Sequence, residues 1–422
     1  MKNFQIILIA VFIAAAIFGM LIFSGAIPLG NKTAGGQGTI VLWGTFRADL
    51  VNTLLEDFNN AHPSYVVQYV QKNPEDFDQN LLEALASGSG PDMFFLPDNL
   101  AYHYSNKILA IPYQSYSVSS FKSSFASAGE VFLTSGGILA FPMTVDPLVM
   151  YYNRSMLDAS GIVYPPNNWD DFVNIVPTLT KKDDSNKIIK SAVALGHFSN
   201  VFHAKDILST LFMQTGNKIV YEKDGRFVPD LTVSIGPFGL DNILKFYTDF
   251  ADPQKNVYSW NKSFPLSQDY FSADNLAFYF GYASELSTLV SKNPNQNFSV
   301  AEMPQIKGSG FKLTSARVTG LAISAFSKNS TTAFLALSDM SSGDFASKLA
   351  RNLGVVPARR DLLAIKQNDA YSPIFYSSAL YARSWLDPSP KDTDDIFRRM
   401  IDGVLANNFG PGDAMADANA KL

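Results

Sequence analysis

The stretch TIVLWGTFRADLVNTLLEDFNNAHPSYVVQYV (residues 39–70) decides the fold class. It opens with Thr39 to Trp43, a short apolar and β-branched run that predicts a buried strand. Apolar residues then recur at helical spacing from Asp49 to Asn60, and His62-Pro63 ends that predicted helix. Val66 to Val70 predicts a second strand. A strand, a helix and a strand in succession indicate a βαβ unit.

The same alternation continues along the chain. Phe77 to Ala86 predicts a helix with Gly88 as its stop, and Met93 to Leu96 predicts a third strand. Because strands alternate with helices, the sequence favours an α/β fold with a mainly parallel sheet. We also predict strands at 138–142, 148–152, 298–303 and 320–324, and helices at 169–179, 204–214, 240–250 and 331–340.

Composition narrows the class of protein. The chain has 422 residues, which suggests two or three domains, and 47% hydrophobic against 17% charged residues excludes disorder as the main state. A net charge of −5 without a Lys/Arg stripe argues against nucleic acid as a partner. The absence of cysteine excludes disulfides, thiolate zinc sites, cysteine nucleophiles and a lipidated N-terminal cysteine.

An apolar run lies near the start of the chain. Phe4 to Phe23 has only Gln5 as a clearly polar member, and as a helix it would span about 30 Å, the thickness of a bilayer core. Secretory signals usually have a shorter apolar stretch, and residues 24–28 offer only a weak cleavage site. We therefore favour an uncleaved transmembrane anchor within residues 1–30 over a removed signal. Lys2 places the N-terminus in the cytoplasm, and residues 31–38 predict a flexible linker.

Few residues offer catalytic or metal chemistry. The four histidines, at positions 62, 103, 197 and 203, show no metal-ligand spacing, so we expect them to be solvated or capping, with no metal or cofactor. The glycine-rich turn at 86–92 lacks the lysine of a P-loop and follows a helix. Carboxylates such as Asp146 and Glu285 could form a glycosidase pair if they converged, which leaves a surface glycan hydrolase as an alternative.

Aromatic residues beside Asp and Asn are more informative. Trp43, Trp260, Tyr270, Tyr279 and Tyr282 lie at strand ends or in polar loops. An aromatic ring next to amides and carboxylates suits a sugar, because the ring stacks on the apolar face while polar groups bind the hydroxyls. The alternative for each ring is that it only covers a loop.

Four segments carry a family resemblance in their order and spacing: TIVLWGTFRADLVNTLLEDFNNAH (39–62), LASGSGPDMFFLP (85–97), FPMTVDPLVMYYNRSMLDASGI with PPNNW (141–169), and GLAIS (320–324) with LGVVPAR (353–359). With these, the chain resembles the extracellular solute-binding proteins (family 1) of ABC importers, a group that includes maltose-binding protein. The resemblance covers nearly everything from Thr39 to Leu422. It implies a two-lobed, periplasmic-binding-protein-like fold (type II), each lobe a mainly parallel sheet flanked by helices.

The resemblance also implies lobe boundaries. Lobe 1 would comprise residues 39–146 plus 303–344, and lobe 2 residues 147–302 plus 345–422. The chain would cross between the lobes at 144–147, near 298–303, and again near 340–345. Ligand would lie in the cleft between the lobes, which close around it as a hinge.

Matching the family's positions to this sequence implies a set of ligand-binding residues: Trp43, Gly44, Phe46, Asp98, Asp146, Tyr151, Trp260, Tyr282, Thr319, Gly320 and Arg359. The implied protein is a monomeric extracellular receptor, not an enzyme. It would capture a polar solute, most of all a carbohydrate, and deliver it to an ABC importer permease in the same membrane. A sensing or adhesion module on the same fold is a further alternative, and the sequence does not identify the solute.

Overall fold

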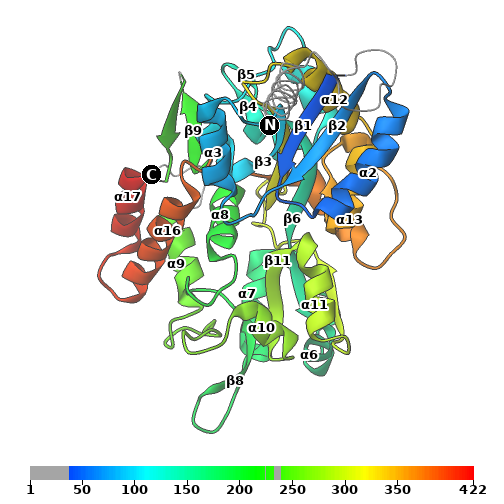
Figure 1. Ribbon diagram of the computed structural model, residues 1–422. Helices are drawn as coiled ribbons and strands as arrows, with labels where there is room; N and C mark the ends of the chain where they lie inside the picture. The colour runs from blue at the N-terminus through cyan, green and yellow to red at the C-terminus, as the bar shows by residue number, and fades with distance from the viewer. Residues whose placement is uncertain (1–37, 224, 232–238) are drawn as a thin grey trace, which may run out of the picture. The chain divides into compact units, whose positions relative to one another are not determined.

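The computed structural model describes residues 38–422, except 224 and 232–238 (Figure 1). Residues 39–422 form one compact unit. The predicted anchor at 4–23 and the linker up to residue 37 lie outside the described residues. Across the described part of the chain, no helix is both long and apolar enough to cross a bilayer.

The N-terminal βαβαβ pattern is confirmed. The helix after the first strand buries Val51, Leu54, Leu55 and Phe58. The sequence spacing predicted Leu50 in place of Val51, and Leu50 is only partly buried. The next helix ends at Gly88, whose φ of 70° lies in the left-handed region that glycine adopts without strain. The elements are β1 (Gly38–Gly44), α2 (Ala48–Ala61), β2 (Tyr65–Gln71), α3 (Phe77–Ser87) and β3 (Met93–Pro97).

The rest of the described chain adds mainly short strands and helices. The strands are β4 (Leu133–Thr134), β5 (Gly137–Ile138), β6 (Phe141–Asn153), β7 (Lys181–Lys182), β8 (Ile188–Val193), β9 (Val220–Lys223), β10 (Arg226–Pro229), β11 (Leu276–Tyr282), β12 (Phe298–Ala301), β13 (Thr314–Ile323), β14 (Val356–Pro357) and β15 (Ala382–Arg383). The 3₁₀ helices are η1 (Asp98–Leu100), η2 (Ser127–Phe132) and η3 (Ala283–Glu285). The α-helices are α4 (Ala101–Tyr104), α5 (Val118–Ser124), α6 (Arg154–Ala159), α7 (Trp169–Leu179), α8 (Ala204–Gln214), α9 (Leu240–Asp249), α10 (Ser267–Ser272), α11 (Leu286–Lys292), α12 (Ser330–Ser341), α13 (Asp344–Leu353), α14 (Arg360–Leu363), α15 (Ser372–Tyr381), α16 (Pro390–Leu405) and α17 (Pro411–Lys421).

The long strand β6 joins two lobes. Its first half, residues 141–147, pairs with β13, and its second half, residues 148–153, pairs with β11 and β12. One hydrogen-bonded path therefore runs β2-β1-β3-β13-β6-β11-β8-β7. We call the part built on β1–β3 and the first half of β6 lobe 1, and the part built on its second half with β8, β11 and β12 lobe 2 (Figure 1). The two strand pieces predicted around 144–147 are thus one continuous crossing strand.

The expectation of mainly parallel sheets is wrong. The pairs β1–β3 and β8–β11 are parallel, but β13 runs antiparallel to both β3 and β6, and β6 runs antiparallel to β11 and β12. The reason is that the crossing strands enter each sheet from the opposite lobe, against the direction of its βαβ strands. Each sheet is therefore mixed.

The later crossings also differ from expectation. β12, predicted near the second crossing, pairs with the lobe 2 half of β6, and the chain returns through β13. Near the expected third crossing, at 340–345, the chain instead stays with lobe 1, because β14 pairs with Thr144 and Val145. β15 then pairs with the start of β13, after which α16 and α17 pack against α9.

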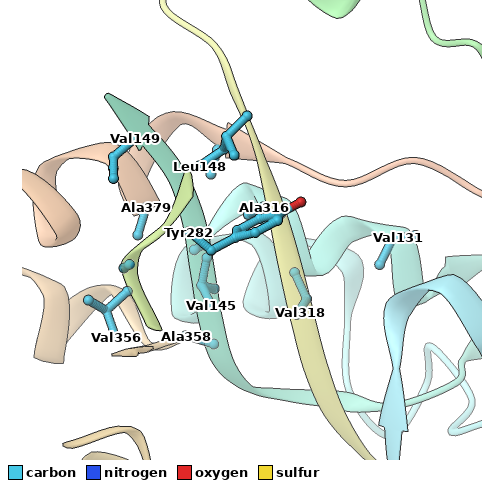
Figure 2. Packing of buried hydrophobic residues seen from close by; sticks show 14 of the residues in the cluster. Val131, Val145, Leu148, Val149, Tyr282, Ala316, Val318, Val356, Ala358 and Ala379 are labelled. Carbon is cyan, nitrogen blue, oxygen red and sulfur yellow. The ribbon is translucent and has the colours of Figure 1, made fainter. Parts of the chain in front are cut away.

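Small and β-branched side chains pack around the crossing strands, as Figure 2 shows for Val145, Val318 and Val356. Two buried hydrogen bonds tie the strands together there. The Thr314 hydroxyl donates to the carbonyl of Leu148 at 2.7 Å, and the Tyr151 hydroxyl donates to the carbonyl of Tyr282 at 2.8 Å. The connection between the lobes is therefore a packed, hydrogen-bonded core.

Candidate ligand-binding cleft

A cavity of about 610 Å³ opens beside the crossing strands. Lobe 1 contributes residues 97–99, at the end of β3, and lobe 2 contributes residues 198–206, which lead into α8. The strand β13 supplies residues 315–319, and the segment after β15 supplies residues 383–387. Small-molecule sites in proteins are typically 300–1,000 Å³ and favour domain interfaces, so this cavity has the size and position of a ligand site.

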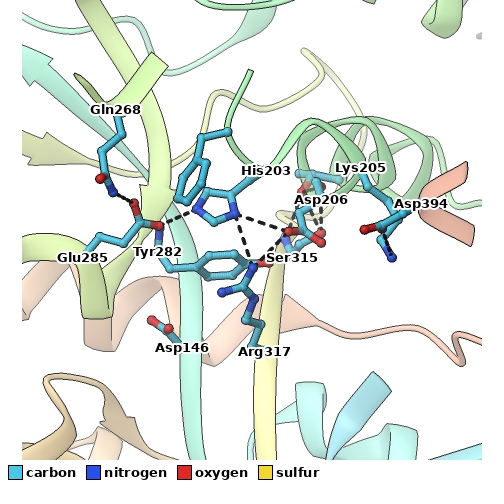
Figure 3. A network of polar contacts seen from close by, with 12 residues as sticks. Asp146, His203, Lys205, Asp206, Gln268, Tyr282, Glu285, Ser315, Arg317 and Asp394 are labelled. Atoms are coloured by element: carbon cyan, nitrogen blue, oxygen red, sulfur yellow. Dashed lines mark hydrogen bonds and ion pairs between the residues drawn. The ribbon is translucent and has the colours of Figure 1, made fainter. Parts of the chain in front are cut away.

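β13 presents Arg317 to the cavity. Successive strand residues point to opposite faces, so Ser315, Arg317 and Thr319 share a face. The Cζ atom of Arg317 lies 4.0 Å from the centre of the Tyr282 ring, a cation–π contact. A guanidinium nitrogen lies 3.6 Å from a carboxylate oxygen of Asp206 (Figure 3). The Arg317 guanidinium thus lies over the Tyr282 ring, with the Asp206 carboxylate as a nearby negative charge.

His203 connects two carboxylates at the edge of the cavity. It precedes α8 with a φ of 64°, and its side chain is only 7% exposed. Its Nε2 lies 2.5 Å from Glu285 and its Nδ1 lies 3.6 Å from Asp206 (Figure 3). Burial alone would lower the pKa of His203, but the hydrogen bonds and charges of both carboxylates outweigh burial and raise it. The prediction of a solvated or capping histidine is therefore wrong for the side chain, although His203 does occupy the N-cap position.

The carboxylates on either side of His203 are held ionised. Burial would raise their pKa values, but the contact with His203 lowers the pKa of both Asp206 and Glu285. Glu285 also accepts hydrogen bonds from the Gln268 side chain at 2.7 Å and from the Tyr282 N–H at 2.8 Å. These contacts fix the carboxylate and the loop after β11.

Two further carboxylates lie near Arg317, and neither has an ion-pair partner within 4 Å among the described residues. Burial raises the pKa of Asp98 to about 6, although the Ser384 hydroxyl donates to its carboxylate. Burial likewise raises the pKa of Asp146 to about 6, although the N–H and hydroxyl of Ser284 donate to it at 3.0 and 2.6 Å. Both groups are therefore poised to change charge just below neutral pH.

A buried lysine fixes the helix beside the cavity. Lys205, whose side chain is 15% exposed, lies 3.1 Å from Asp387 and 2.5 Å from Asp394. Its ammonium group also donates to the hydroxyl of Thr393 at 3.1 Å. These contacts tie α8 to the start of α16. The positive charge of Lys205 is therefore paired with carboxylates of the protein itself.

The cavity is partly apolar. Phe198, Phe202, Leu266 and Trp385 line it, and Trp385 stacks on Phe397 with ring centres 6.2 Å apart. The lining also includes polar groups of β13 and of the residues that follow β3. Such a combination fits a ligand with an apolar face and several hydroxyl groups.

Three of the predicted ligand residues line the cavity: Asp98, Tyr282 and Thr319. A fourth, Asp146, does not line it but is the strand partner of Arg317 (Figure 3). Asp98 directly follows β3, and the other three come from β6, β11 and β13.

The other predicted residues do not line this cavity. Trp43 is covered by Lys72, whose ammonium lies 3.5 Å from the ring centre, and Phe46 packs on Phe95. Arg359 pairs with Asp361 at 2.8 Å. Gly44, Tyr151, Trp260 and Gly320 are buried.

The sequence-based prediction missed Arg317, His203, Asp206 and Trp385. Arg317 had a usable signal, since the strand predicted at 320–324 begins at Thr314, and alternation from Thr319 then leads to Arg317 and Ser315. His203 and Trp385 had none, because they reach the cavity through contacts between distant segments.

The alternatives raised from sequence have these outcomes. Asp146 and Glu285 make separate contacts: Asp146 accepts a hydrogen bond from the Ser284 hydroxyl, and Glu285 pairs with His203 (Figure 3). Tyr270 and Tyr279 are buried and serve as core side chains. Among the described residues, no group of three or more His, Asp or Glu side chains is arranged to hold a metal ion.

Comparison with known proteins gives consistent results. The family described as "Bacterial extracellular solute-binding protein" matches residues 47–338. Among solved structures, a cyclo/maltodextrin-binding protein complexed with maltotetraose has a TM-score of 0.73 at 16% identity, covering 92% of this chain and 97% of that one. The extracellular solute-binding protein from Staphylococcus aureus in complex with maltose has a TM-score of 0.71 at 14% identity, with the same coverage. An ABC transporter solute-binding protein from Thermotoga lettingae bound with α-D-tagatose has a TM-score of 0.63 at 19% identity, covering 91% and 98%. These similarities establish the two-lobed fold.

Proposed function

This chain belongs to the bacterial extracellular solute-binding proteins, and from that premise we propose that it captures a neutral oligosaccharide in the cleft and delivers it to an ABC importer. The observation that carries the proposal is the cavity itself, whose lining combines Trp385 and two phenylalanines with Asp98, Arg317 and Thr319. The similar structures with maltotetraose and maltose bound support the same ligand class.

The charges in the cavity favour a neutral ligand. Lys205 is neutralised by Asp387 and Asp394, and Arg317 lies against Asp206. Because an anionic ligand that paired with Lys205 or Arg317 would have to displace these internal pairs, it would lose much of its binding free energy to the groups left unpaired. Hydroxyl groups can instead add hydrogen bonds to charged side chains that keep their partners.

We assign the ligand contacts to residues that line the cavity. From the predicted set these are Asp98, Tyr282 and Thr319, with Asp146 orienting Arg317 from outside. To these we add Arg317 and Trp385. Trp43, Gly44, Phe46, Tyr151, Trp260, Gly320 and Arg359 support the fold around the cleft.

We propose the same location as the sequence suggested. The binding unit would lie outside the cell or in the periplasm as a monomer, held at the membrane by residues 4–23 and joined to its anchor by the linker. The linker would keep the receptor at high local concentration near its permease. Deleting residues 4–23 should then move the protein from the membrane fraction to the soluble fraction.

A thermal-shift screen tests the ligand class. The purified protein is heated with maltotriose, maltotetraose, mannobiose, glucuronate, glucosamine and spermidine, each at several concentrations. A neutral oligosaccharide at about 100 times its Kd should add about 2.7 kcal/mol to the free energy of unfolding. Stabilisation by the charged compounds alone would contradict the proposal.

A further inference from the structure

The hairpin of β9 and β10 lies between α8 and α9 in the chain. Its register places Glu222 directly opposite Phe227. Directly opposed residues of an antiparallel pair point to the same face, so this face of the hairpin carries one carboxylate and one ring. Neither residue belongs to the cavity wall.

Glu222 reaches the turn between β4 and β5 in lobe 1. The Ser135 hydroxyl donates to its carboxylate at 2.6 Å, and the Ser135 N–H lies 3.3 Å from each of its oxygens. The two residues are 87 positions apart in the chain. The contact therefore joins two separate hairpins (Figure 1).

Phe227 makes a second contact with lobe 1. Its ring centre lies 4.2 Å from that of Tyr102, with the ring planes at 78°. Tyr102 belongs to α4, which follows Asp98 and Asn99 of the cavity wall almost directly. The contact thus lies close to the lobe 1 side of the cleft.

The base of the hairpin is attached elsewhere. Asn217, just after α8, donates to the carbonyl of Asp230 at 2.6 Å. The N–H of Leu231 donates to Asn419 of α17 at 2.8 Å, and α17 packs against α9. α9 in turn contacts lobe 2, because Phe246 lies against Trp169 of α7. The hairpin is thus rooted on the lobe 2 side and reaches lobe 1 through Glu222 and Phe227.

We propose that the β9–β10 hairpin is a strap between the lobes, which holds them in the observed arrangement without help from ligand. A hinge motion that separates the lobes must break the contacts of Glu222 and Phe227 together. The strap therefore sets how often the unliganded protein opens. This inference stands on the contacts alone; its consequence for affinity rests on the proposed function.

Distances between spin labels test the strap directly. The chain has no native cysteine, so Asn52→Cys on α2 and Asp170→Cys on α7 introduce the only labels, one on each lobe. Pulsed electron resonance then gives the distance distribution in the unliganded full-length protein. The distribution is compared with and without Glu222→Gln plus Phe227→Ala. Val228→Ala is the matched control, because Val228 lies on the opposite face of the same hairpin.

We expect the double variant to add a population at longer distance, while Val228→Ala leaves the distribution unchanged. Tyr102→Ala, which leaves the hairpin sequence intact, should have the same effect, and Tyr102→Phe should not. Unchanged distributions in both the double variant and Tyr102→Ala would overturn the strap.

Affinity provides a second readout. The apparent Kd rises as the fraction of molecules in the binding-competent lobe arrangement falls. Tyr102→Ala should therefore raise the Kd for maltotriose by roughly 3- to 10-fold, whereas Tyr102→Phe should leave the Kd unchanged. An unchanged Kd in Tyr102→Ala, for a protein that does bind maltotriose, would refute the link to affinity. If the parent protein binds no saccharide, the proposed function fails while the distance measurement still decides the strap.

Discussion

Arg317 is the side chain on which the chemistry of the cleft converges. It lies over Tyr282, faces Asp206, and influences the charge of both Asp98 and Asp146. Its guanidinium offers several N–H donors in a fixed plane, and part of it remains open to the cavity. A bound sugar could therefore receive hydrogen bonds from Arg317 without breaking its internal contacts.

Replacing Arg317 should weaken binding selectively. Arg317→Ala removes charged donors, and hydrogen bonds from charged groups contribute about 1.5–3 kcal/mol, so we expect Kd to rise about 10- to 100-fold. Arg359→Ala is the control, since Arg359 bonds to Asp361 outside the cavity. Calorimetric titration of both variants measures the effect. Equal losses in the two variants would show that Arg317 does not contact the ligand.

Asp98 should make stability depend on pH. Its pKa is about 6 in the folded protein and about 3.8 as a free side chain, so the folded state binds more protons between these values. The free energy of unfolding should therefore fall as pH rises from about 4 to about 6 and stay level above. Asp98→Asn removes this loss and should stabilise the protein by about 1–3 kcal/mol at pH 7.5 but little at pH 4.

Urea unfolding at both pH values measures this difference. Asp361→Asn serves as the comparison, because the Arg359 hydrogen bond lowers the pKa of Asp361 and its replacement should not stabilise. The gain in free energy of unfolding over the parent should be larger at pH 7.5 than at pH 4. An equal gain at the two pH values would contradict a buried Asp98 carboxyl with a raised pKa.

The sequence could predict cavity residues that lie at the ends of predictable strands. Asp98 and Tyr282 each follow a short apolar run, and both reach the cavity. Trp43 meets the same description, yet Lys72 covers its ring. Sequence alone could not separate these cases, because the difference is a contact made by Lys72, which follows β2.

At the scale of elements, the crossing of β6 and β13 leaves no room for a larger side chain at Gly320. A Cβ at Gly320 would lie 2.7 Å from the Ala140 side chain and 2.8 Å from the Phe132 ring. Interiors are close-packed, so neither neighbour can withdraw without opening a gap elsewhere. The sequence predicted Gly320 as a cleft residue, whereas its role is close packing.

Gly320→Ala should therefore destabilise the protein by about 1–3 kcal/mol, the usual cost of overpacking. Gly412→Ala is the matched control: a Cβ there meets nothing within 4 Å, and alanine in a helix should stabilise by about 0.5–1 kcal/mol. Urea denaturation of both variants measures the change in the free energy of unfolding, which should be negative for Gly320→Ala and positive for Gly412→Ala. A neutral Gly320→Ala would mean that the crossing is more loosely packed than described.

Local periodicity predicted the helices α7 and α8 at their observed bounds, and the first three strands closely. The crossing elements were harder. β13 extends six residues further back than its predicted start, because its first residues are held by pairing with β6 and β15. Such pairings join residues more than 60 positions apart and leave no local pattern.

At the scale of the whole binding unit, the family resemblance predicted two lobes and a cleft, and the sheet path confirms that β6 connects them. The cleft exists because β6 pairs in both lobes and β13 leads from β12 in lobe 2 back to β3 in lobe 1, so residues from distant segments meet there. The same crossing explains the mixed strand directions. The predicted lobe boundaries after residue 302 could not be read from sequence, since they depend on where β14 and β15 pair.

The central claim is that a neutral oligosaccharide binds in this cleft, and tryptophan fluorescence tests it most directly. Of the four tryptophans, only Trp385 lines the cavity. Titration with maltotriose or maltotetraose should give a saturable change in emission that disappears in Trp385→Phe and persists in Trp43→Phe. No saturable change with any neutral oligosaccharide, or a change that Trp385→Phe leaves intact, would contradict the account.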